Sequence, residues 1–157
     1  IPNERGIMIS MSTKNRLQTD MREALRAGDD QRKSTLRMVL ASIKLAEVNK
    51  GAELDDGEVL AIVQKEVKSR QESIADAERA ARPELAAEAQ SEIAILETYL
   101  PKPFTEAELE NLARQVIAEV GANSAREMGL VMKALVPRLE GRATGSQASQ
   151  IVRRLLG

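Results

Sequence analysis

The side chains that most often carry enzyme chemistry are scarce in this 157-residue chain. It contains no Cys and no His, which excludes a thiolate nucleophile, an imidazole base and the sulfur or imidazole ligands of common metal sites. Ser and Lys adjoin at Lys33-Ser34 and Lys68-Ser69, but both pairs fall inside expected helices, where adjacent side chains point about 100° apart. No Gly precedes a Lys, and no GxGxxG motif is present. We therefore expect no catalytic residues and no cofactor.

Acidic side chains concentrate between residues 51 and 100, where twelve Asp and Glu stand against five Lys and Arg. Carboxylate-bridged metal sites in helical bundles use Glu-x-x-His pairs, and the chain has no His. The basic residues of this segment interleave with the acids at spacings that allow ion pairs along a helix. We therefore predict a solvated or helix-pairing acidic surface and no metal site.

Basic side chains gather near the C-terminus, where residues 126–157 carry six Lys and Arg against two Glu. Arg126 and Lys133 are seven residues apart and share one helix face. Arg142 lies in a loop before the last expected helix, whose N-terminal amides suit a phosphate. The alternative is an ordinary charged surface with a helix cap at Thr144 or Ser146. The candidate RNA-binding residues are Arg126, Lys133, Arg138, Arg142, Arg153 and Arg154.

Apolar residues recur at helical spacing along the chain, and with one Phe, one Tyr and no Trp the composition favours an all-α fold. Four helices are expected before residue 100. The first ends at Gly28, the second runs from Asp29 or Asp30 to about Gly51, the third begins near Asp55, and the fourth begins at Pro83. Three more are expected afterwards. One runs from Thr105 to Gly121, the next has inward residues from Met128 to Leu139, and the last follows the loop over 141–145 and includes Ile151, Val152 and Leu155.

Two closely spaced prolines mark the clearest boundary in the sequence. The segment Pro101-Lys102-Pro103 interrupts any helix and is predicted to act as a hinge that fixes the angle between two helical units. The predicted organisation is a leader or vector-derived remnant over 1–10, an N-terminal helical domain over 11–100, a connector over 101–104 and a C-terminal three-helix domain over 105–157.

The uncharged stretches are much shorter than the roughly 20 residues that a membrane span needs. Residues 1–10 lack the apolar core of a secretory signal. We therefore expect a cytoplasmic protein without membrane contact.

Three segments, ETYLPKPFTEAEL, MGLVMKALVPRLEGRATG and SQIVRRLL, resemble the YqeY family. That family is related to the tail domain of the B subunit of the tRNA-dependent amidotransferase. The resemblance covers Met11 to Gly157 and implies an N-terminal helical domain, a C-terminal three-helix domain and kinship to a tRNA-handling module rather than to a catalytic one. Leu130 and Ser146 stand where Lys is common in the family, and Thr144 stands where Asp is common.

Two hypotheses of function follow. In the first, the protein is a non-catalytic accessory protein that binds tRNA or another structured RNA through its basic C-terminal domain, without base stacking because aromatic residues are scarce there. In the alternative, it is a protein–protein adaptor that uses the long acidic helices and binds no nucleic acid.

Overall fold

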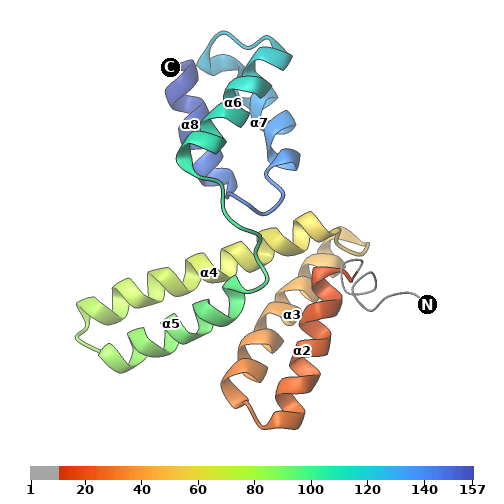
Figure 1. The fold of residues 1–157 in the computed structure, drawn as a ribbon, viewed down its shortest axis with the longest axis vertical. Helices are drawn as coiled ribbons and strands as arrows, with labels where there is room; N and C mark the ends of the chain where they lie inside the picture. Colours follow the sequence, from red (N-terminus) through yellow and green to blue (C-terminus); the bar gives the residue numbers. More distant parts are fainter. Residues whose placement is uncertain (1–10) are drawn as a thin grey trace. The chain divides into compact units, whose positions relative to one another are not determined.

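The computed structural model describes residues 11–157, and within that range it contains helices, turns and loops without strands, so the all-α prediction is confirmed (Figure 1). The predicted leader over 1–10 lies outside the described residues. The chain divides into two compact units, one ending at Tyr99 and one running over Leu100–Gly157. The helices are α2 (Thr13–Ala27), α3 (Asp30–Lys50), α4 (Asp56–Arg79), α5 (Pro83–Glu97), α6 (Glu106–Val120), η1 (Ala125–Glu127), α7 (Met128–Leu135), η2 (Val136–Arg138) and α8 (Gly145–Leu156), η denoting a 3-10 helix.

Local capping chemistry sets the helix ends where the sequence predicts them. Helix α2 ends at Gly28 and α3 at Gly51, each in the left-handed conformation with φ of 70° and 75°. Asp55 begins α4 with a capping box, in which its side chain accepts from Glu58 N–H and Glu58 accepts from Asp55 N–H. Pro83 begins α5, where its missing N–H costs no helical hydrogen bond.

The N-terminal unit consists of two helical hairpins. Helices α2 and α3 run side by side, and so do α4 and α5 (Figure 1). Leu17, Leu36, Ile43, Val63 and Leu96 are fully buried in its core.

Tyr99 holds the C-terminal end of the N-terminal unit against α2. Its ring is buried, its hydroxyl donates to the carboxylate of Asp20, and the Arg16 guanidinium lies 5.1 Å from the ring centroid. The last residue of the unit is therefore anchored by a hydrogen bond and a cation–π contact.

The C-terminal unit is a three-helix bundle of α6, α7 and α8 around one core that includes Val116, Val131, Leu135 and Val152. Helix α7 is shorter than its apolar pattern predicts. Pro137 cannot donate an N–H bond, so the chain continues from Val136 as η2, which still turns Leu139 into the core.

No helix within residues 11–157 combines the length and the apolar character that crossing a bilayer would require.

Candidate functional site

The six candidate RNA-binding residues lie on different elements of the C-terminal unit. Arg126 is on η1, Lys133 on α7, Arg138 on η2, and Arg142 in the loop before α8; Arg153 and Arg154 are on α8. The prediction that one helix carries Arg126 and Lys133 was wrong, because a 3-10 turn precedes α7 and holds Arg126. Arg142 is half-buried and the other five are exposed. Their contacts divide them into three groups.

Arg138 and Arg154 form ion pairs with acidic residues of α6. Arg138 lies 2.5 Å from Glu119, and Arg154 lies 3.2 Å from Glu106 and 3.1 Å from Glu110. The hydrogen bond from Arg138 lowers the pKa of Glu119. Such exposed pairs contribute little to stability, so these arginines can exchange a carboxylate partner for a phosphate at small cost.

Arg142 fixes the proline connector to the C-terminal unit. Its Nε donates to the Lys102 carbonyl at 2.9 Å, and its guanidinium carbon lies 4.0 Å from the centroid of the Phe104 ring. The Phe104 N–H donates to the Arg142 carbonyl at 2.9 Å, and Glu108 lies 3.6 Å from the guanidinium. Arg142 therefore has a structural role that its place in a basic loop did not indicate.

Arg126, Lys133 and Arg153 are exposed cations whose side chains form no ion pair or hydrogen bond within residues 11–157. They are the members of the predicted set whose charge is available to an external anion.

The N-terminus of α8 is closed by a capping box. The Thr144 side chain accepts from Gln147 N–H at 3.1 Å, and Thr144 N–H donates to the Gln147 side chain at 2.9 Å. Thr144 is thus the cap, and two of the amides that a phosphate would use already have partners.

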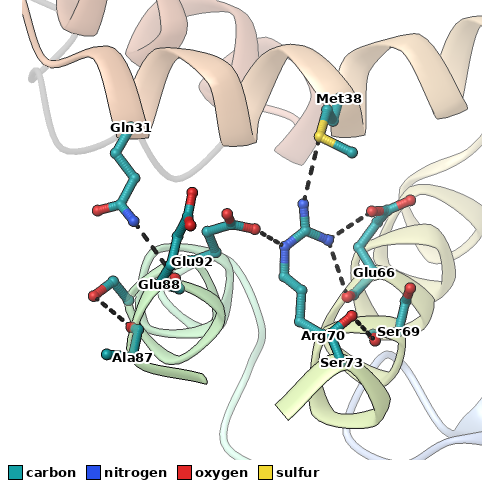
Figure 2. A network of polar contacts seen from close by, with 10 residues as sticks. Gln31, Met38, Glu66, Ser69, Arg70, Ser73, Ala87, Glu88 and Glu92 are labelled. Atoms are coloured by element: carbon teal, nitrogen blue, oxygen red, sulfur yellow. Dashed lines mark hydrogen bonds and ion pairs between the residues drawn. The ribbon is translucent and has the colours of Figure 1, made fainter. Parts of the chain in front are cut away.

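A buried arginine in the N-terminal unit forms the densest polar cluster (Figure 2). Arg70 of α4 is 6% exposed; its Nε donates to Glu92 of α5 at 2.6 Å and its Nη1 to Glu66 at 2.7 Å. Its Nη2 contacts the Met38 sulfur of α3 at 3.9 Å. Burial opposes the charged form, but the hydrogen bonds to Glu66 and Glu92 outweigh it and raise the pKa of Arg70. One side chain thereby joins three helices.

The sequence predicts Arg70 only as one of several basic residues on a solvated or helix-pairing acidic surface, although a signal for its burial was present. Val63, Val67, Arg70, Ile74 and Ala77 are spaced four, three, four and three residues apart, which is the inward stripe of α4. A charged residue on that stripe predicts a buried ion pair.

A surface cleft of about 540 Å³ lies between α4 and α5 beside Arg70. Leu85, Glu88 and Glu92 are among its lining residues, and the acidic Asp76 pairs with Arg79. No group of three or more acidic residues within 11–157 is arranged to hold a metal ion. The Ser-Lys pairs lie inside α3 and α4, and Lys33 contacts Asp30 at 3.4 Å.

Comparisons with known proteins identify relatives over nearly the whole chain. The family described as Yqey-like protein matches residues 14–156. The protein named "Altered inheritance of mitochondria protein 41, mitochondrial" of Pyrenophora tritici-repentis is 28% identical over 90% of this chain and 80% of its own length. Proteins of the same name from Vanderwaltozyma polyspora and Kluyveromyces lactis are 33% and 36% identical over 54% and 53% of this chain, and the chain spans about half of their length, 46% and 45%.

These names correct the expectation of a cytoplasmic protein, because the relatives are named as mitochondrial. The expectation was wrong because it rested on the lack of an apolar secretory signal. Mitochondrial targeting segments are amphipathic and rich in Arg and Ser rather than apolar, so that test does not detect them.

Proposed function

Since the chain belongs to the YqeY-like protein family, we propose that it is a non-catalytic accessory protein that binds tRNA or another structured RNA through its C-terminal unit. The observation that carries the proposal is the set of exposed, unpaired cations Arg126, Lys133 and Arg153 on that unit. Kinship of the family to the tail domain of the tRNA-dependent amidotransferase supports the same direction.

Contacts of this kind would engage the phosphate backbone rather than the bases. Phe104 is the single aromatic residue after residue 100, and its face is covered by Arg142. A base therefore has no free aromatic platform on which to stack. Arg138 and Arg154 would add contacts by releasing their α6 carboxylates.

An adaptor role is the second candidate because of the cleft between α4 and α5. Leu85 lines it while 44% exposed, and the Glu88 side chain has no ion-pair partner within 11–157. Glu92 and Asp76, in contrast, already pair with Arg70 and Arg79. Because these carboxylates are already paired, the surface around the cleft carries less unpaired negative charge than the count of Asp and Glu in the sequence indicates. This favours the RNA proposal over the adaptor.

The experiment is a salt series of tRNA binding to the full chain. Charge reversal of Arg126, Lys133 and Arg153 to Glu should weaken binding of all RNA sequences similarly. It should also reduce the slope of log affinity against log salt by roughly 0.7–0.9 for each phosphate that the variant no longer neutralises.

The matched control reverses three exposed cations of the N-terminal unit, Arg22, Lys65 and Lys68, and should leave the slope unchanged. If tRNA does not bind at low salt, or both triple variants behave alike, the RNA proposal is wrong. If Glu88→Lys loses a protein that binds the parent chain, and neither the parent nor any variant binds RNA, the result favours the adaptor.

A further inference from the structure

Helix α3 is apolar on two opposite sides. Leu36, Val39 and Ile43 are buried in the core of the N-terminal unit. On the other side Met38, Leu45 and Val48 are 55%, 62% and 69% exposed. A surface helix ordinarily carries one apolar stripe, which faces the core. The second stripe of α3 is therefore a candidate surface for binding a partner.

The exposed stripe has the spacing of a helix-pairing seam. Met38, Ala41, Leu45 and Val48 follow one another at intervals of three, four and three residues, as the a and d positions of a heptad do. We refer to these four residues as the α3 seam. It spans about 15 Å of helix, or roughly three turns. Met38, at one end, points toward Arg70 (Figure 2).

The charges beside the α3 seam specify the partner. Arg37 and Lys44 each precede a seam residue by one position and are exposed. Neither forms an ion pair or a side-chain hydrogen bond within 11–157, although Lys44 acts on Glu47 through its charge. On the opposite flank the residues of α3 itself, Ser42 and Asn49, are uncharged, and Ser42 donates to Glu66 of α4 at 3.1 Å, a carboxylate that already pairs with Arg70. An apolar seam with unpaired cations on one flank is complementary to a helix with acidic flanks.

We propose that the α3 seam is the docking site for an amphipathic α-helix of a partner protein, whose apolar stripe is flanked by Asp or Glu. The proposal is independent of RNA binding, because the seam lies in the N-terminal unit.

The same residues disfavour other occupants. In an antiparallel pairing of two copies, Arg37 and Lys44 would face their own counterparts and repel. In a parallel pairing they would face Ser42 and Asn49, which carry no charge and offer no ion pair, whereas Asp or Glu of a partner helix would. A membrane surface fits poorly because the seam contains Ala41 and no aromatic residue, and only two cations flank it.

The test uses a synthetic four-heptad peptide with Leu at positions a and d and Glu at e and g, and a twin with Lys in place of Glu. Fluorescence anisotropy with the full chain at low salt should show at least tenfold tighter binding of the Glu peptide. Leu45→Ser should weaken binding about tenfold, because an apolar side chain no longer becomes buried. Arg37→Glu with Lys44→Glu should reverse the preference toward the Lys peptide.

Leu130→Ser is the matched control, because Leu130 is a leucine of the C-terminal unit with similar exposure, 57% against 62% for Leu45, and it should not alter binding. Val48→Ser provides a second seam variant should Leu45→Ser fold poorly. The proposal is overturned if neither peptide binds, or if Leu45→Ser and Leu130→Ser bind alike. It is equally overturned if sedimentation shows that the chain forms a dimer that Leu45→Ser abolishes. Binding of the parent chain to anionic vesicles that the seam variants lose would also overturn it.

Discussion

Replacing Arg70 by Met tests the energetics of the polar cluster that joins α3, α4 and α5. Methionine fills similar space but donates no hydrogen bond, so Glu66 and Glu92 lose a shared partner while only 19% and 23% of their side chains are exposed. Removing one member of a buried ion pair costs about 3–5 kcal/mol. Because water reaches one side of both carboxylates, we expect Arg70→Met to lower the free energy of unfolding by about 3 kcal/mol.

Tyr99 provides the assay, since the chain has one Tyr and no Trp. It is buried in the N-terminal unit. Its fluorescence in a urea titration therefore follows that unit, even if the two units unfold separately.

Two further variants test whether loss of the buried ion pairs is the cause of the destabilisation by Arg70→Met. Arg79→Met removes an exposed i,i+3 pair with Asp76 and should cost less than about 1 kcal/mol. The triple variant Arg70→Met, Glu66→Gln, Glu92→Gln leaves no unpaired charge and should recover most of the stability that Arg70→Met removes. If Arg70→Met costs no more than Arg79→Met, or if the triple variant is no more stable than the single one, the ion-pair argument fails.

Two other predictions concern the same unit. Burial raises the pKa of Tyr99, and the hydrogen bond to Asp20 raises it further. Above about pH 10, the pKa of Tyr in the unfolded chain, the unfolded state therefore loses its proton first. The unit should then lose up to about 1.4 kcal/mol of stability per pH unit. Tyr99→Phe should remove this loss of stability at high pH. Tyrosinate absorbance that rises at about pH 10 in the folded chain would show that the pKa of Tyr99 is not raised and would contradict the prediction. Ala81 has a φ of 56°, so Ala81→Gly should raise the urea midpoint by the equivalent of about 0.5–1 kcal/mol, whereas Ala80→Gly, at φ −85°, should lower it.

Helix ends were the most predictable part of the fold because they depend on neighbouring residues. Asp55 with Glu58, Thr105 with Glu108, and Gly121 each determine a helix end by contacts within a few positions. The early end of α7 was equally local, since it follows from Pro137, but the apolar pattern continued through that proline to Leu139. Periodicity reports which residues face inward and does not distinguish an α-helix from the 3-10 turn that follows it.

Partner assignments could not be predicted in the same way, because they depend on residues far apart in the chain. Arg142 contacts Lys102 and Phe104 about forty positions earlier, and Tyr99 bonds Asp20 across seventy-nine. A basic loop residue and an aromatic residue near a proline pair are each compatible with several roles. Only the packed unit shows that Arg142 serves the connector.

The charge of the C-terminal unit also could not be judged from one segment of the sequence. Residues 126–157 carry six basic residues against two acidic ones, but the whole unit from residue 100 carries eight against six, because α6 brings Glu106, Glu108, Glu110 and Glu119. Those carboxylates lie against Arg154, Arg142 and Arg138. A field that nearly cancels over the unit provides weak long-range attraction for a polyanion. If RNA binds here, its affinity must therefore come from short-range contacts at the unpaired Arg126, Lys133 and Arg153 rather than from net charge.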